Sequence, residues 1–166
     1  MRLEAIYNLL VKKCKIENIT NVGFLGNDEI IGHYQRSHDQ AIRPGYFGTD
    51  SAGINISNCI GTEITKTEIT KINSRNGNAM GIDIMFQSDL EIEKTNIYHI
   101  RAGHLTSDKK WRGEDCYGEI TKYSEEMPNK IPRAIGIQIE KSQVEIENVE
   151  ISDLHSPAKP VKVLRV

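Results

Sequence analysis

Three copies of one four-residue run decide the fold of this chain: Gly53-Ile54-Asn55-Ile56, Gly81-Ile82-Asp83-Ile84 and Gly136-Ile137-Gln138-Ile139. Each run is followed by a Glu-Ile pair that Thr, Leu or Val precedes, at 62–64, 90–92 and 144–146. An isoleucine and a second aliphatic residue close each copy, at 69 and 72, 97 and 100, and 151 and 154. The first two copies are 28 residues apart at every landmark. A repeat of three short β-runs predicts a stack of units, each of which buries its apolar edge against the next.

Alternation along the runs assigns the two faces of each strand. If Ile54 and Ile56 point inward, Asn55 points outward, and so do Asp83 and Gln138 in their copies. The isoleucines then form buried columns, which suit β-branched residues in parallel sheets. The sequence therefore predicts an all-β chain that folds as a parallel β-helix of about four coils.

The first coil is expected to be incomplete. Cys14, Ile19 and Val22 match the spacing of the later aliphatic positions Ile64, Ile69 and Ile72. This alignment predicts that Cys14 lies in the core, where a thiol acts as a small hydrophobe.

The N-terminal segment, 1–12, has two readings. Leu3, Ile6, Leu9 and Leu10 lie at helical spacing, so a short amphipathic helix could cap the open end of the stack. A strand over Leu9-Leu10-Val11 competes with the helix.

Bulk composition narrows the class of protein. At 166 residues the chain is long enough for one domain over 1–166 with a continuous core. A net charge of −2 gives no basic surface for nucleic acid, and no apolar run is long enough to span a membrane. The N-terminus does not resemble a secretory signal, and three cysteines fit neither a disulfide framework nor a metal motif. We expect a cytoplasmic or phage-associated location rather than secretion.

The copies differ mainly in the connection after the third run. It is long over 23–52 and 101–134 and short after Ile72. Such inserts should leave from one edge of the stack and cluster in space, which is where repeat proteins usually bind.

The Gly-Ile-x-Ile, x-Glu-Ile and x-Ile-x-x-Ile runs over 12–156 resemble the right-handed parallel β-helix of the pectin lyase-like superfamily. The resemblance implies a right-handed helix with long inserts on one edge. It also implies that Gly-Ile-x-Ile is the first strand and that a sugar groove follows the outer face of that strand. The superfamily includes polysaccharide lyases, hydrolases and uronate epimerases as well as proteins that only bind or scaffold.

The outward ladder Asn55–Asp83–Gln138 is the leading candidate for a site. Neighbouring parallel strands are about 4.8 Å apart, so Asp83 would lie between two amides that can bind sugar hydroxyls or orient its carboxylate. The resemblance implies catalytic carboxylates on this face. The alternative is that these positions are polar only because they face water.

The inserts add further candidates. His38 is a proton acceptor near neutral pH with Asp39 beside it, and His104 is a second candidate proton shuttle. Arg75 and Arg101 could neutralise a uronate carboxylate. The aromatic candidates for stacking on a sugar are Tyr46 and Trp111.

A second outward ladder, Glu63–Glu91–Glu145, predicts a solvated acidic face, with a cation site as the less favoured reading. No spacing of ligands supports a metal centre, and no cofactor is implied.

Two functions remain open at this point. The first is a carbohydrate-handling protein that binds an acidic polysaccharide and, if it is an enzyme, cleaves or epimerises it. The second is a non-catalytic structural or interaction module, such as a spike-like segment, for which a homo-oligomer would cover the open ends.

Overall fold

The fold of the chain is all β. A computed structural model describes residues 1–21, 50–75, 77–105, 111–114, 120–121 and 132–166. Within these ranges every regular element is a strand, and no helix is long and apolar enough to cross a membrane.

Three parallel sheets carry most of the described residues. The first sheet runs, in spatial order, β1 Arg2–Glu4, β4 Ser51–Ser57, β7 Ala79–Met85, β13 Ala134–Ile139 and β17 Val161–Arg165. The second runs β2 Leu10–Lys12, β5 Thr62–Thr65, β8 Asp89–Glu93 and β14 Gln143–Glu147. The third runs β3 Lys15–Asn21, β6 Glu68–Ser74, β9 Asn96–Ala102 and β15 Glu150–Ile151, with β16 Leu154–His155 also paired to β9. A small antiparallel sheet contains β10 His104–Leu105, β11 Trp111–Glu114 and β12 Ile120–Thr121.

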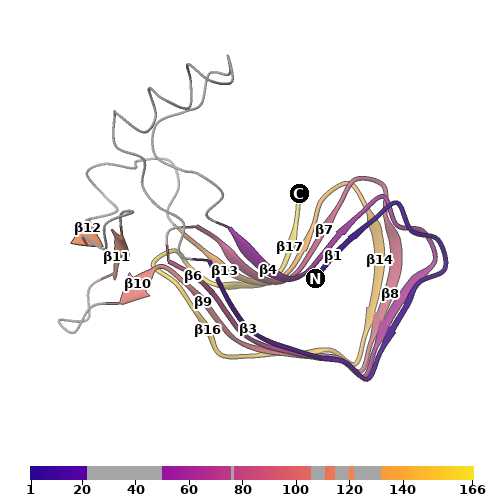
Figure 1. Cartoon of the computed structure of the whole chain (residues 1–166), viewed down its shortest axis with the longest axis horizontal. Coiled ribbons are helices and arrows are strands. Elements are labelled where there is room, and N and C mark those ends of the chain that lie inside the picture. Colours follow the sequence, from indigo (N-terminus) through magenta and orange to yellow (C-terminus); the bar gives the residue numbers. More distant parts are fainter. Residues whose placement is uncertain (22–49, 76, 106–110, 115–119, 122–131) are drawn as a thin grey trace, which may run out of the picture.

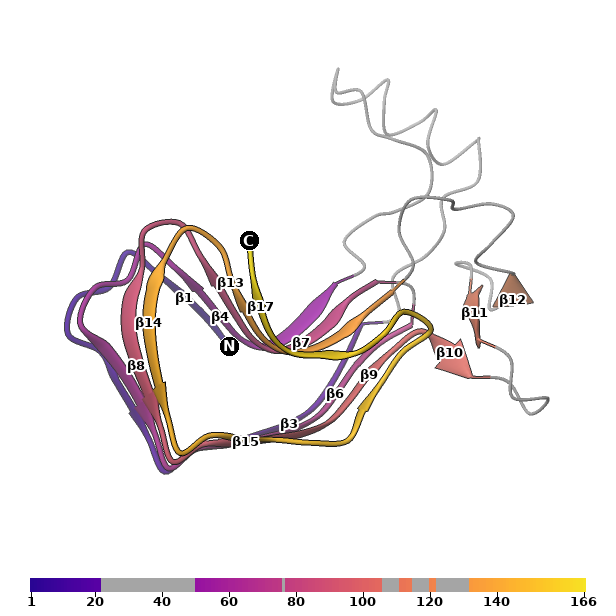
Figure 2. The ribbon, with the colours of Figure 1, turned by 180° about the vertical axis from the view of Figure 1, so that it is seen from behind.

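The three parallel sheets lie on three sides of the core, and within each sheet the strands lie one behind another (Figures 1 and 2). We call one strand from each sheet, taken in chain order, a rung. The described rungs are β1–β2–β3, β4–β5–β6, β7–β8–β9 and β13–β14–β15. Strand β17 extends the first sheet alone.

The expectation of a single right-handed parallel β-helix of about four coils is wrong. The chain instead forms three separate parallel sheets of short strands. It also forms the antiparallel sheet β10–β11–β12 inside the 101–134 insert, where no strands were expected. The strands stay short because residues with a left-handed backbone bend the chain between or within them, including Asn58, Lys66 and Lys94.

The predicted capping helix over 1–12 is also wrong, and the strand alternative is closer to the structure. Leu3 pairs with Ile56 in the first sheet, and Val11 pairs with Ile64 in the second. Positive φ angles of 52° at Ala5 and 54° at Asn8 are incompatible with a right-handed helix. The open edges of β4 and β5 supply backbone partners that an isolated short helix would lack.

The predicted core positions of the first copy, Cys14, Ile19 and Val22, are wrong by three residues. The partners of Ile64, Ile69 and Ile72 are Val11, Ile16 and Ile19. Cys14 is therefore exposed rather than in the core. Its side chain donates to the Lys12 carbonyl at 3.5 Å, at a corner of the chain.

Columns of isoleucine fill the core, as the repeat predicts. Fully buried members of successive rungs stand in register: Ile54–Ile82–Ile137, Ile56–Ile84, Ile64–Ile92 and Ile69–Ile97. The flanking rungs are less covered, and Ile146 and Ile16 there are only partly buried.

A bend within the third sheet explains how residues three apart can both face the core. Ile69 and Ile72 are both buried, although alternation would place them on opposite faces. Between them Lys71 has a φ of 56°, and the register neighbours Asn18, His99 and Asp153 also have positive φ. Every strand bends at the same register position, so the chain turns there while the one-to-one pairing continues on both sides of the bend.

Glycine begins each Gly-Ile-x-Ile run because the first and third sheets approach closely there. A Cβ on Gly81 would lie 2.4 Å from Ile97 Cγ2 and 2.6 Å from the Gly136 carbonyl oxygen. Gly53 and Gly136 meet the equivalent isoleucines, Ile69 and Ile151, in the same way. No side chain fits at these positions without moving backbone.

The connections between the third and first sheets share one edge of the molecule. Asn21, Ser74 and Ala102 near the ends of their strands are register neighbours. Ser51 and Ala134, where the chain re-enters the first sheet, both pair with Ala79. The long connections therefore leave and return at neighbouring positions, although residues 22–49 lie outside the described part of the chain.

Candidate functional site

The ladder Asn55–Asp83–Gln138 exists in the predicted register on the outer face of the first sheet. Asp83 pairs with Asn55 of β4 on one side and with Gln138 of β13 on the other. Asn55 Nδ2 donates to Asp83 Oδ2 at 2.8 Å, and Gln138 Nε2 donates to Asp83 Oδ1 at 3.1 Å. Both carboxylate oxygens are thus held by amides from the adjacent strands.

Burial dominates the electrostatics of Asp83. Its exposed fraction is only 5%, and this loss of solvent raises the pKa of the carboxyl above its ordinary value. The hydrogen bonds from Asn55 and Gln138 oppose the shift but do not overcome it. A general acid or base must reach its substrate. The geometry therefore makes Asp83 first of all an anchor within the ladder.

A hollow of about 480 Å³ lies over the Asn55–Asp83 part of this ladder, on the outer face of the first sheet. Its lining residues are Met1, Arg2, Asp50, Ser51, Ala52, Asn55, Met80, Asp83 and Met85. The bottom of the hollow is formed by neighbouring residues of β4 and β7. Ala52 pairs with Met80, and three residues further along Asn55 pairs with Asp83. An apolar row therefore lies beside an amide–carboxylate row.

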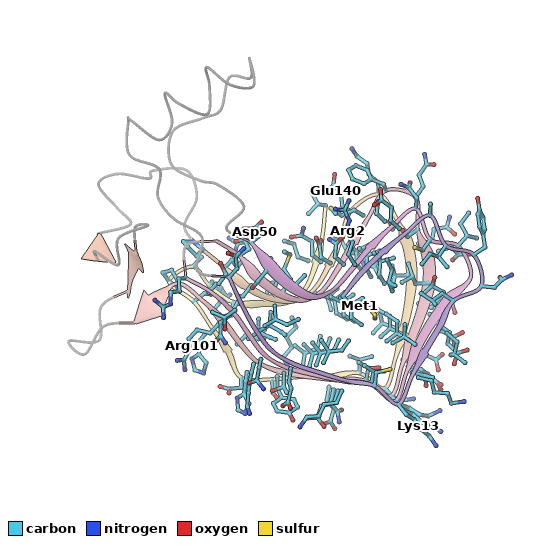
Figure 3. All side chains as sticks on the ribbon, viewed as in Figure 1. Met1, Arg2, Lys13, Asp50, Arg101 and Glu140 are labelled. Atoms are coloured by element: carbon cyan, nitrogen blue, oxygen red, sulfur yellow. The ribbon has the colours of Figure 1, made fainter. Side chains whose placement is uncertain are left out.

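Side chains at the margin of the hollow come from several segments. Figure 3 shows Arg2 and Asp50 on the same side of the first sheet, where Glu140 also lies. The backbone N–H of Asn78 donates to Asp50 Oδ1 at 2.8 Å, and Asn21 Nδ2 donates to the Asp50 carbonyl at 2.9 Å. These bonds fix the residue that leads into β4.

The two predicted arginine clamps do not line the hollow. Arg101 is exposed on β9 in the third sheet, beside Asn73 and His155 in register. Figure 3 places it away from Arg2 and Glu140. Arg75 follows β6, where its N–H donates to the Asn21 carbonyl at 3.0 Å. The first sheet and the arginines therefore do not form one carboxylate site within the described residues.

The remaining candidates lie in the inserts. His104 pairs with Arg112 and Leu105 with Trp111 in the β10–β11 ladder, and only their backbone is described. His38, Asp39 and Tyr46 lie outside the described residues. Their predicted roles as proton shuttle and sugar contacts stay predictions.

A cluster that the sequence did not reveal lies on the third sheet. The carboxylate of Asp153 bonds to His99 Nδ1 through one oxygen and to His155 Nε2 through the other. All three side chains are more than a third exposed. The hydrogen bonds from His99 and then His155 lower the pKa of Asp153. One feature of the sequence could have indicated this contact: His99 and Asp153 are 54 residues apart, the same separation as the paired residues Ile97 and Ile151.

The second sheet carries the predicted acidic ladder. Glu63, Glu91 and Glu145 are register neighbours and line a hollow of about 290 Å³ together with Asp89. Among the described residues no group of three or more His, Cys, Asp and Glu side chains is arranged to hold a metal ion. This ladder is an acidic surface.

Comparison with known proteins adds no assignment. The chain matches no family model, no curated protein and no solved structure. The pectin lyase-like resemblance therefore stays a prediction, and the function has to be argued from the site itself.

Proposed function

We propose that the chain is a non-catalytic carbohydrate-binding protein that holds a sugar in the hollow over the first sheet. The proposal rests on the arrangement of residues at the bottom of the hollow, where the apolar pair Ala52–Met80 lies beside the polar pair Asn55–Asp83. Binding sites for small molecules combine an apolar surface with a few placed polar groups. A pyranose presents the matching chemistry, because it has apolar C–H faces and a rim of hydroxyls.

The charges favour a neutral sugar over the acidic one expected from sequence. The described lining contains the carboxylates of Asp50 and Asp83, balanced by the guanidinium of Arg2 and the N-terminal ammonium of Met1, while Arg75 and Arg101 do not line it. Carboxylates accept hydrogen bonds from hydroxyls but repel a uronate. A neutral oligosaccharide therefore suits this surface better.

The test is isothermal titration of the purified chain against neutral and uronate-containing oligosaccharides. Ala52→Phe should fill the hollow and weaken binding at least tenfold, about 1.4 kcal/mol. Ala158→Phe is the matched control, since Ala158 does not line the hollow. Failure of every neutral sugar to bind, or equal binding by the two variants, would contradict the proposal.

Hydrolysis is a second candidate, and one observation favours it. Two carboxylates, Asp50 and Asp83, line the same hollow, as a glycosidase requires, and burial raises the pKa of the Asp83 carboxyl. An assay for new reducing ends over the same panel separates this candidate from binding alone. Activity that disappears in both Asp50→Asn and Asp83→Asn would move the assignment to a glycosidase.

A further inference from the structure

The two ends of the stacked rungs have open sheet edges. Within the described residues β2 and β3 pair on one side only, with β5 and β6, while β14 and β15 pair only with β8 and β9. These strands lie at opposite ends of their sheets. Unpaired backbone groups on a parallel edge are a template for a further strand.

Apolar side chains are half covered at both ends. At the β2–β3 end these are Leu9, Ile16 and Ile19, and at the β14–β16 end they are Val144, Ile146 and Leu154. In the interior rungs, by contrast, the equivalent isoleucines are fully buried. Each end is therefore only partly covered: Val11 and Ile151 are buried, whereas their apolar neighbours stay half-exposed.

The strand register within the second and third sheets indicates which strands could pair with these open edges. The columns run Val11–Ile64–Ile92–Ile146, Ile16–Ile69–Ile97–Ile151 and Ile19–Ile72–Ile100–Leu154. If a second copy continues these columns, its Val11, Ile16 and Ile19 cover Ile146, Ile151 and Leu154 of the first. Every contact repeats a pairing that the chain already makes between its own rungs.

Opposite charges at the two ends favour an arrangement in which the β2–β3 end of one copy meets the β14–β15 end of another. In the continued register Lys12 of one copy faces Glu147 of the other, as Lys12 now faces Thr65. Likewise Lys15 faces Glu150. Joining two equal ends would not place Lys12 and Lys15 opposite Glu147 and Glu150, because the two lysines lie on β2 and β3 and the two glutamates on β14 and β15.

The first sheet allows the arrangement with one adjustment. Continued in register, β17 of one copy would lie along β4 of the next, with Val161 beside Ala52 and Leu164 beside Asn55. In the next copy, however, β1 already pairs with the latter half of β4. Val163–Val166 of one copy and the first residues of the next copy would therefore occupy the same position. The side chains at this overlap are largely exposed, including Met1 at 45% and Val166 at 74%. One of these two chain ends must therefore move aside.

We propose that copies of this chain associate head to tail, with β14 and β15 of one copy pairing with β2 and β3 of the next. Such an interface joins two different surfaces, so it generates open chains of copies or rings rather than a closed two-fold dimer.

The first experiment is sedimentation velocity of the full chain over a range of concentrations. The average mass should rise with concentration. The double variant Lys12→Glu/Lys15→Glu should weaken association roughly tenfold, because it turns two opposite-charge contacts into like-charge contacts. Lys66→Glu/Lys71→Glu is the control with the same change in net charge, since both residues belong to the β4–β5–β6 rung, which takes no part in the proposed pairing.

Charge reversal on the other side then tests direct contact. Adding Glu147→Lys/Glu150→Lys to the first double variant should restore association, whereas a loss caused by misfolding would not be rescued. Circular dichroism of each variant verifies the fold.

Truncation tests the overlap in the first sheet. A chain ending at Lys162 should associate more tightly than the full chain, because Val163–Val166 no longer compete with β1. A full chain and a truncated chain that both stay monomeric at every concentration would overturn the proposal, and so would equal association by the charge-reversed and control variants. In that case Lys12 and Lys15 would act as edge charges that prevent association.

Discussion

Two carboxylates in this molecule are held in the same way and behave in opposite ways. Asp83 on the first sheet bonds to Asn55 and Gln138, and Asp153 on the third sheet bonds to two histidines. The pKa of Asp83 is raised by burial, whereas the pKa of Asp153 is lowered by its hydrogen bonds. Asp83 is 5% exposed and the side chain of Asp153 is 38% exposed. Burial, rather than the number of hydrogen-bond donors, decides the sign of the shift.

The largest expected effect comes from separating the two sheets that carry these carboxylates. Gly81 lies two residues before Asp83, and its missing Cβ lets β7 approach Ile97, two residues before His99. Gly81→Ala would force backbone to move, so we expect the free energy of unfolding in urea to fall by about 3 kcal/mol.

The control is Gly61→Ala, at a corner with a φ of +65°. There an added Cβ would meet mainly the flexible side-chain oxygen of Asn8, at 2.7 Å. We expect a cost of about 1 kcal/mol from the left-handed backbone. Equal losses for the two variants would show that close sheet packing at Gly81 is not the constraint.

Removal of each carboxylate should separate a buried anchor from an exposed one. Asp83→Ala leaves the half-buried amides of Asn55 and Gln138 without their acceptor, which should cost about 1 kcal/mol in urea unfolding. Asp153→Asn keeps a residue type that tolerates the φ of 51° there, and its exposed histidines can bond to water. Its cost should stay below about 0.5 kcal/mol. A larger loss at Asp153 than at Asp83 would contradict the comparison.

The pH dependence of stability should run in opposite directions at the two sites. The raised pKa of Asp83 means that its stabilising contribution is present below the unfolded pKa of about 3.9 and is lost as pH rises through the folded pKa. The lowered pKa of Asp153 means that its contribution is present above that unfolded pKa and is lost as pH falls through the folded pKa. Urea unfolding between pH 3 and 7 of the wild type, Asp83→Asn and Asp153→Asn measures both differences. On acidification the wild type should gain relative to Asp83→Asn and lose relative to Asp153→Asn, and parallel changes would contradict this assignment.

The same contrast shows what the sequence could predict. Asn55, Asp83 and Gln138 were placed correctly because each sits inside a Gly-Ile-x-Ile run whose isoleucines fix the face and the register. His99 and Asp153 fall at the bend between two inward aliphatic residues, where a left-handed residue breaks the alternation that identifies outward positions. A two-residue period could not reveal that these side chains meet.

The prediction for the N-terminal rung is wrong for a related physical reason. It lacks a Gly-Ile-x-Ile run, so only the spacing of Cys14, Ile19 and Val22 guided the alignment. The correct set, Val11, Ile16 and Ile19, has the same spacing and is distinguished only by pairing with β5 and β6. That pairing is tertiary, and it also turned an amphipathic pattern over 1–12 into two strands.

The smallest predicted effect concerns a third carboxylate in the same kind of ladder. Glu91 lies between Glu63 and Glu145 in register, so it has carboxylates where Asp83 has amides. Like charges opposite one another in a sheet are destabilising, and these residues are exposed or half-exposed, so the penalty is modest. Glu91→Gln should therefore raise the free energy of unfolding by about 0.5 kcal/mol at low salt, and the gain should shrink in about 1 M salt, where the screening length is near 3 Å. Glu4→Gln, on the first sheet and ion-paired with Arg2, removes the same charge without relieving that repulsion and should bring no gain. A salt-independent gain at Glu91 would mean that shape or hydrogen bonding, rather than charge, distinguishes this ladder from the one around Asp83.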